Sequence, residues 1–340
     1  MCIRDRGTAI TKRGNKKLTW ETTSEFNIGL DLGFFDNRIS LSMEYYNRII
    51  SDLLVSNKSL PAYNEINTIA ANIGKTQGRG FELTLSTVNI MNKDWTWSTD
   101  FTFYTFKDNW YERDPNWKPA AYESKKDPIR SYYSYVSDGL LQVGEKAPAW
   151  QPTLVPGQIK LKNLYDTGTS PNVLDQYDKV NLGSQDPKCT LGLNNTLRYK
   201  NLDFNIYFYG EIGRLRGASY YDAWIVGLGN SLTNVSQQSL HSYTNANQNT
   251  TVPNLIESAY DFGDYYHKKI NYLRCRNITL GYTIPVSKSI ANSVRISANV
   301  SNPFVFTNWN GVDPETDTGN FSYPNVTCLL YTSPSPRDCS

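Results

Sequence analysis

The sequence predicts an all-β chain: part of a transmembrane β-barrel, seen as an open, curved antiparallel sheet of about 8–10 long strands. Three observations predict it. Apolar and polar residues alternate over long runs, which is the period of a strand with two different faces. The runs exceed the five or six residues usual for strands in soluble sheets. Short turns alternate with long connections, which is typical of outer-membrane barrels with short periplasmic turns and long extracellular loops.

The first predicted hairpin lies in residues 18–54 and shows the pattern most clearly. Even-numbered residues from Phe26 to Phe34 are apolar, and the odd-numbered residues between them are polar or small. A tight-turn composition follows at Phe35-Asp36-Asn37-Arg38. Odd-numbered residues from Ile39 to Tyr45 are then apolar. Period two on both sides of a turn predicts a β-hairpin with one face toward lipid and the other toward a wet lumen.

The next strands continue the alternation. We expect one near residues 76–88, a turn at 91–94 and a strand from Trp95 through Phe103. Residues 107–188 hold eight of the 16 prolines. The direction of the flanking strands places this segment outside the cell. Within it, Ile129 to Leu141 is expected to form a strand in or above the barrel wall.

Two further hairpins are predicted. One spans residues 191–208 and turns at Lys200-Asn201. The other spans residues 278–300, with a turn near residue 287, after a long polar connection over residues 211–269. Leu273 is out of phase with Ile278. A β-bulge between them or a position of Leu273 beyond the bilayer would explain the change.

The pattern assigns side chains to two faces. One face should carry Phe26, Ile28, Leu30, Leu41, Met43, Leu83, Leu85, Phe101, Phe103, Leu193, Phe204, Ile206, Leu280, Ile296 and Ala298. The other should carry Glu25, Asp31, Glu44, Glu82, Asp100, Asp203 and Arg295. Residues 308–325 show no period-two apolar run, so we expect no strand there and no closed barrel.

Several motifs carry a resemblance to a known family. They are Leu18-Thr19-Trp20-Glu21-Thr22-Thr23, Phe26-Asn27-Ile28-Gly29-Leu30-Asp31, Gly78-Arg79-Gly80-Phe81-Glu82-Leu83, Arg276-Asn277-Ile278-Thr279-Leu280-Gly281-Tyr282 and Asn302-Pro303-Phe304-Val305-Phe306-Thr307. The chain resembles SusC/RagA-type TonB-dependent outer-membrane transporters over most of residues 15–325. The resemblance implies a place in the outer membrane of a Gram-negative cell and import of oligosaccharides or peptides. It also implies a SusD-like lipoprotein partner, and energy from TonB through an N-terminal part. In that family the barrel has about 22 strands and holds a plug. The plug and the earlier strands are missing from this sequence.

Both ends of the chain look foreign to the fold. Residues 1–6 and residues 328–340 resemble translated sequencing-adapter read-through and are set aside. Residues 7–327 are then the C-terminal part of the barrel. Three of the five cysteines lie in these ends, and Cys189 and Cys275 have neither metal-ligand spacing nor a disulfide pattern.

Composition and motifs favour a protein that is not an enzyme. The formal net charge of +2 gives no argument for nucleic acid. No nucleophile motif or phosphate loop is present, and the two histidines, His241 and His267, lie in the long connection over residues 211–269. Two other readings stay open. An outer-membrane barrel hydrolase would need a Ser–His pair at the rim, and a secreted β-sandwich carbohydrate-binding module would be soluble without detergent.

Two weak candidate sites lie in the segments placed outside. A degenerate loop resembles a calcium loop of the family and would use oxygen ligands for a structural calcium; no other cofactor is expected. Its residues are Asn163, Asp166, Asp175 and Asp178. Exposed aromatic side chains could stack on sugars or pack against peptides. These are Trp110, Trp117, Trp150, Tyr220, Tyr221 and Trp224.

Overall fold

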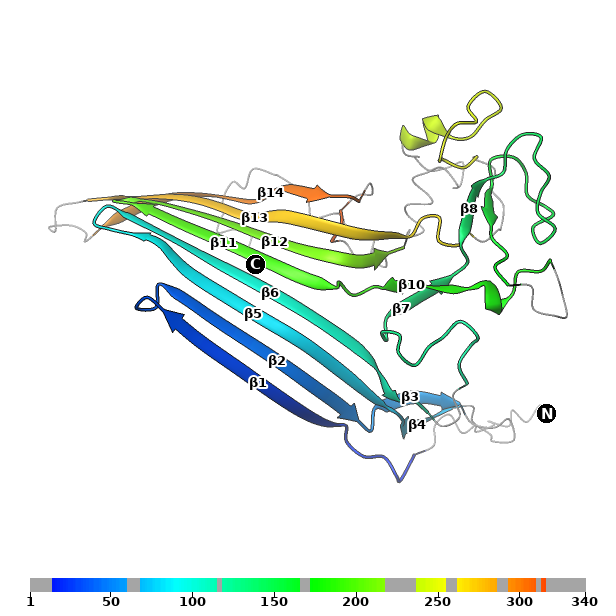
Figure 1. The fold of residues 1–340 in the computed structure, drawn as a ribbon, viewed down its shortest axis with the longest axis horizontal. Coiled ribbons are helices and arrows are strands. Elements are labelled where there is room, and N and C mark those ends of the chain that lie inside the picture. Colours follow the sequence, from blue (N-terminus) through cyan, green and yellow to red (C-terminus); the bar gives the residue numbers. More distant parts are fainter. Residues whose placement is uncertain are drawn as a thin grey trace, which may run out of the picture.

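A computed structural model describes residues 14–59, 68–114, 118–165, 172–217, 237–254, 262–285, 293–309 and 313–315. Eight long strands form one sheet in the order β1-β2-β5-β6-β11-β12-β13-β14 (Figure 1). They are β1 (Thr22–Phe34), β2 (Ile39–Ser51), β5 (Lys75–Met91), β6 (Trp95–Glu112), β11 (Cys189–Tyr199), β12 (Leu202–Arg216), β13 (Lys268–Ile284) and β14 (Val294–Thr307). Every neighbouring pair is antiparallel. The predicted fold class is confirmed.

Three small two-stranded sheets lie in the long connections, beyond the end of the large sheet that is opposite the short turns (Figure 1). They pair β3 (Leu54–Ser59) with β4 (Thr68–Asn72), β7 (Ser131–Ser134) with β10 (Val180–Ser184), and β8 (Ser137–Leu140) with β9 (Ile159–Leu161). Two short 3-10 helices, η1 (Gln176–Asp178) and η2 (Gln237–His241), complete the elements of the described residues. Within those residues, no helix has the length and apolar character needed to cross a membrane, which does not bear on crossing by strands.

Between β2 and β5, the short strands β3 and β4 pair with each other. One expectation about the connections was wrong. Ile129 to Leu141 is not one strand, because it divides into β7 and β8, which pair with different partners. At the start of β8, the backbone N–H of Ser137 donates to the carboxylate of the distant residue Asp264 at 2.7 Å.

The register of the large sheet places apolar side chains in rows that cross all of its strands. Residues opposite each other in an antiparallel pair share a face. One apolar row runs Leu30, Met43, Leu83, Phe103, Leu191, Gly210, Leu273 and Phe306. The next runs Leu32, Leu41, Leu85, Phe101, Leu193, Phe208, Cys275 and Phe304. The predicted lipid-facing set therefore lies on one face.

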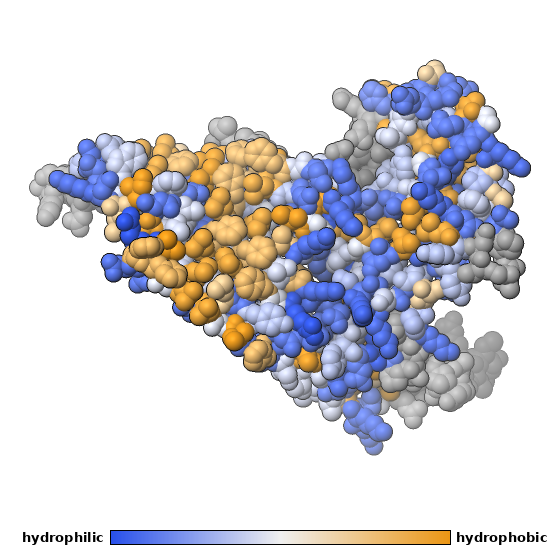
Figure 2. All heavy atoms as spheres, in the orientation of Figure 1, coloured by the Kyte–Doolittle hydropathy of each residue, from blue (hydrophilic) through white to orange (hydrophobic). Residues whose placement is uncertain are grey.

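The opposite face is polar at the same level. Between the two apolar rows runs a row of Asp31, Ser42, Thr84, Thr102, Gly192, Tyr209, Arg274 and Val305. Phe26, Ile28 and Leu30 on the apolar face are 60%, 58% and 51% exposed. Figure 2 shows the apolar side chains as a broad band over the sheet, bordered by hydrophilic residues. A contiguous exposed apolar surface of this kind needs a covering, and lipid supplies it for a barrel wall.

The phase change in β13 comes from a β-bulge. In the ladder with β12, the consecutive residues Tyr207 and Phe208 lie opposite Asn277 and Cys275, so Arg276 is the extra residue. Leu273 consequently faces the same side as Ile278, as one of the two predicted explanations requires. A second bulge in β5 lies between Val88 and Ile90.

The sheet is open, because β1 and β14 are its two edges. The described residues of the 308–325 stretch, which are 308–309 and 313–315, lie outside strands. Residues 1–6 and 328–340 lie outside the described part of the chain, so their assignment as adapter-like ends stays a prediction.

Candidate functional site

The polar face of the sheet carries side-chain hydrogen bonds. The hydroxyl groups of Tyr46 on β2 and Tyr104 on β6 lie 2.8 Å apart. Asp100 accepts hydrogen bonds from Ser86 at 2.8 Å and from Asn194 at 3.4 Å. A face lined by such donors and acceptors suits a water-filled passage, whereas lipid offers them no partners.

The long connections build a small unit with its own core past the end of the sheet. Leu140, Ile159, Leu161 and Tyr243 form the buried cluster. Tyr135, Leu174, Phe262, Tyr265 and Tyr266 pack around it. Segments from the 113–188 and 217–267 connections therefore fold together.

One ion pair holds the 140–160 part of this unit. Lys160 Nζ lies 2.5 Å from Glu145 Oε1, and Glu145 also accepts a hydrogen bond from the backbone N–H of Gln142 at 2.9 Å. The hydrogen bond from Lys160 is the main reason that the pKa of Glu145 falls below its ordinary value of 4.5. In β7, burial and then a hydrogen bond to Asp127 raise the pKa of Tyr133.

Of the six predicted aromatic site residues, the structure describes two, and both are engaged with the protein. Trp150 donates from its indole N–H to the carbonyl of Leu161 at 2.8 Å. Trp110 lies at the outer end of β6, with the guanidinium of Arg113 5.4 Å from its ring centre. Trp117, Tyr220, Tyr221 and Trp224 lie outside the described residues. A ligand-binding role for this set stays a prediction.

The predicted calcium loop is organised by backbone hydrogen bonds. Asp178 is fully buried. Its carboxylate accepts from the N–H groups of Leu164 at 2.7 Å, Tyr165 at 3.0 Å and Asp175 at 2.9 Å. Asp175 in turn accepts from Tyr177 N–H at 2.7 Å, so the two aspartates form a capping box around η1.

The other two residues of the predicted calcium loop give no further support for a metal site. Asn163 lies in the described part, and Asp166 falls outside it. In the described part of the chain, no group of three or more acidic, histidine or cysteine side chains could hold a metal ion. Calcium binding at this loop stays a prediction.

Sequence reasoning missed a buried cluster on the polar face. Arg274 is 1% exposed and contacts both carboxylate oxygens of Asp313 at 2.8 Å. It also donates to Glu315 at 2.7 Å, and Arg276 contacts the same Glu315 at 2.8 Å. These contacts hold residues 313–315 against β13. Nothing in the local sequence around Arg274 indicates a partner 39 residues away.

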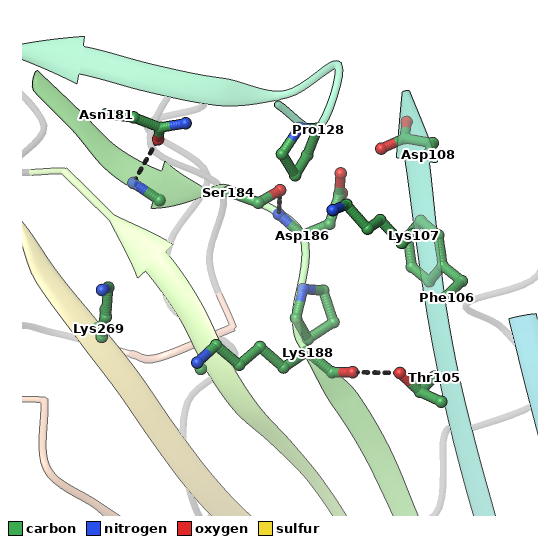
Figure 3. Close-up of a pocket in the computed structure, with 13 residues that line it drawn as sticks. Thr105, Phe106, Lys107, Asp108, Pro128, Asn181, Ser184, Asp186, Lys188 and Lys269 are labelled. Carbon is green, nitrogen blue, oxygen red and sulfur yellow. Dashed lines mark hydrogen bonds between the residues drawn. The ribbon is translucent and has the colours of Figure 1, made fainter. Parts of the chain in front are cut away.

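A rim pocket of about 380 Å³ lies where β6 and β11 stop pairing (Figure 3). Their ladder ends at Thr190 opposite Tyr104. Beyond it, β10 and the chain leading into β11 lie between the outer ends of β6 and β12. The pocket is lined by Thr105, Phe106, Lys107, Asp108, Pro128, Asn181, Gly183, Ser184, Asp186, Pro187, Lys188, Gly213 and Lys269. Its lysines come from β6, from the residue that precedes β11 and from β13, so no local motif predicts that they line one pocket.

Comparison with known proteins gives a consistent answer. The family model described as "TonB dependent receptor-like, beta-barrel" matches residues 5–302. The chain is 29% identical to TonB-dependent receptor P3 of Formosa agariphila, over 94% of this chain and 34% of that protein. It is 28% identical to TonB-dependent receptor SusC of Bacteroides thetaiotaomicron, over 95% of this chain and 32% of that protein.

A solved structure shares the fold. The chain superposes on the structure of the RagAB peptide transporter with a TM-score of 0.71 and 21% identity, over 92% of this chain and 34% of that one. In length, the chain spans about a third of the curated relatives that it matches.

Proposed function

The chain belongs to the TonB dependent receptor-like β-barrel family, and from this premise we propose that it builds part of the wall of an outer-membrane importer of the SusC/RagA type. Members of this family lie in the outer membrane, which is therefore the location of this chain. Its curated relatives are named as receptors and not as enzymes.

One observation carries the proposal: rows of apolar side chains cross all eight strands on one face, and a polar row crosses them on the other. A wall between lipid and water needs this division at every strand. In a soluble sheet one face packs on a core, whereas here Phe26 and Ile28 on the apolar face are more than half exposed.

The proposed cargo is an oligosaccharide or a peptide, taken in together with a SusD-like surface lipoprotein. The unit around Tyr243 supports this, because it gives the extracellular end a folded surface on which a partner could sit. The complete receptor would draw energy from TonB through its plug. The RagAB structure that shares the fold is described as a peptide transporter.

Two other functions lack support. A β-sandwich module needs two sheets packed face to face, but the described residues form one eight-stranded sheet and three two-stranded sheets, with no second large sheet among them. A hydrolase at the rim would need a histidine paired with a serine. The ring of His267 instead stacks on Tyr132 with centroids 4.3 Å apart, and His241 lies exposed at the end of η2. Neither position gives support for a hydrolase.

Uptake by a complete receptor that carries these residues tests the proposal. Cells expressing it would be given a labelled oligosaccharide mixture or a labelled peptide mixture, with and without functional TonB. We expect TonB-dependent uptake of one of the two mixtures and co-purification of a surface lipoprotein. A correctly folded receptor that takes up neither mixture and retains no lipoprotein would contradict the proposal.

A further inference from the structure

The rim pocket contains three lysines whose ammonium groups have no hydrogen-bond or ion-pair partner among the described residues. Lys107, Lys188 and Lys269 line it (Figure 3). No hydrogen bond or ion pair joins their Nζ atoms to any other described residue. Salt bridges elsewhere in the described chain use other lysines, such as Lys75 and Lys160. Three unpaired ammonium groups around one pocket are a site for an anion.

The pocket lies at a definite level of the barrel wall. The lower border of the apolar face is a row containing Trp95 and Tyr199, whose rings lie 4.3 Å apart. From Trp95 to Thr105 is ten residue steps along β6. At about 3.4 Å a step and a strand tilt of about 40°, this rises about 26 Å, close to the roughly 25 Å apolar band of an outer-membrane barrel. Lys107, two residues further out, lies just above the band.

Two of the lysines belong to the lipid-facing side. Lys107 lies opposite Arg79 in the ladder between β6 and β5. Arg79 is on the same face of β5 as Phe81, and Lys107 is on the same face of β6 as Phe103. Lys269 lies two positions beyond Asn271 and four beyond Leu273 on the same face of β13. Lysine and arginine at this level extend their charged ends to the headgroup layer.

The remaining polar groups of the pocket favour a sugar phosphate over a bare phosphate. Asp186 Oδ1 is paired with Arg130 at 2.7 Å, whereas Asp186 Oδ2 is buried with no partner among the described residues. A ligand hydroxyl could donate to this oxygen. Asp108 is the other carboxylate of the lining. Arg130 and the three lysines outnumber the two carboxylates, so the surroundings stay positive.

We propose that the rim pocket binds the phosphorylated sugar headgroup of an outer-leaflet glycolipid, with Lys107, Lys188 and Lys269 contacting the phosphate. Asp186 then accepts from a sugar hydroxyl, and the acyl chains lie along the apolar rows below. The site faces the lipid, so it is independent of which cargo the barrel transports. Bound lipid would fill the gap that opens where β6 and β11 separate.

The test uses a complete receptor that carries these residues, freed of lipid in detergent. Its affinity would be measured for lipid A in mixed micelles, for enzymatically dephosphorylated lipid A, and for inorganic phosphate. We expect at least roughly tenfold tighter binding of the phosphorylated form, because each basic group near a surface contributes measurably to anion binding. Inorganic phosphate alone should bind much more weakly than lipid A.

A matched pair of variants locates the site. The variant K107Q/K188Q/K269Q should lose the preference for the phosphate. K118Q/K125Q/K126Q removes the same charge from exposed residues of the 118–127 segment and should keep the preference. Equal binding of both lipid forms by the unaltered receptor would overturn the proposal without any variant. Inorganic phosphate binding as tightly as lipid A would show a free-anion site, and equal losses in the two variants would show a nonspecific charge effect.

Discussion

Arg295 on β14 reaches across β13 to form a two-point ion pair with Asp203 on β12, with atom pairs at 3.2 and 2.5 Å. The strand between them contributes Gly281 at the crossing point. A Cβ there would lie 2.6 Å from Asp203 Oδ2 and closer still to Arg295 Nη2. Gly80 has the same role under Tyr46, which reaches over β5 to Tyr104. Glycines on the polar face therefore let side chains of next-but-one strands meet.

These two crossings predict different costs for adding a methyl group. Gly80→Ala forces the ring of Tyr46 to move and breaks its hydrogen bond to Tyr104, so we expect a loss of about 1–3 kcal/mol in unfolding free energy. Gly281→Ala displaces only the flexible ends of an exposed ion pair, and we expect a clearly smaller loss, because such pairs contribute little to stability. Urea unfolding of the complete receptor in lipid vesicles measures both. Gly78→Ala is the control, since nothing lies within 4 Å of a Cβ there. A Gly80→Ala variant as stable as this control would show that the crossing is unimportant.

An arginine should be tolerated on one face of β5 and not on the other. Leu85 lies in an apolar row, and its neighbour Thr84 lies in the polar row. We expect Leu85→Arg to cost about 2–4 kcal/mol, because the charge enters the lipid near the middle of the apolar band. Thr84→Arg adds the same side chain one residue away and should cost far less. The two variants are compared by the fraction of folded receptor in outer membranes, measured by heat-modifiable mobility on gels. Similar losses of folded receptor would mean that the two faces are not divided in this way.

Removing the charge of Arg274 should loosen the segment over residues 313–315. Arg274→Gln leaves the carboxylates of Asp313 and Glu315 without their main partner. Breaking a buried ion pair by losing one member costs about 3–5 kcal/mol. Limited proteolysis should then cut near residue 313 much faster than in the unaltered receptor. Arg276→Gln removes a partner that is about one-third exposed and should have a smaller effect. Unchanged cleavage in Arg274→Gln would contradict this anchoring role.

Acid should weaken the unit around Tyr243 through Glu145. The pKa of Glu145 is lower in the folded state than its usual 4.5. Its contribution to stability is therefore complete above that value and is lost as the pH falls through the lowered pKa. Hydrogen exchange of residues 139–162, corrected for intrinsic rates, should show more protection than in Glu145→Gln at about pH 6, and the difference should shrink as the pH is lowered towards about 3. A difference that stays the same at the lower pH would exclude this ion pair as the cause.

The strands and their faces were predictable from the sequence because alternation is a local property. Leu83 and Phe103 were assigned to the same face before any pairing was known, since each follows the period of its own strand. For the same reason, the phase change before Ile278 indicated either a bulge or a position of Leu273 beyond the bilayer, and the structure has the bulge. The 129–141 segment was not predictable in this way, because the partners of β7 and β8 lie far along the chain and their strands are only four residues long.

The candidate sites depend on contacts between distant residues, which local patterns do not contain. Asp178 was singled out as a calcium ligand, although its three backbone partners show a loop-ordering role for its carboxylate. Arg274 finds its partners only after the chain has turned back past β14. Lys107, Lys188 and Lys269 meet because the ladder between β6 and β11 ends early. Each of these contacts depends on the strand register and on where the strands end, and composition determines neither.

The central claim is that alternate residues of the sheet face lipid and water. Single cysteines on β11 test it most directly in a complete receptor, with Cys189 and Cys275 replaced by alanine. In intact outer membranes, a water-soluble maleimide should label cysteines at Asn194, Thr196 and Arg198. Cysteines at Leu193 and Leu197 should react only after unfolding. Equal labelling at all five positions, or the reverse alternation, would contradict the account.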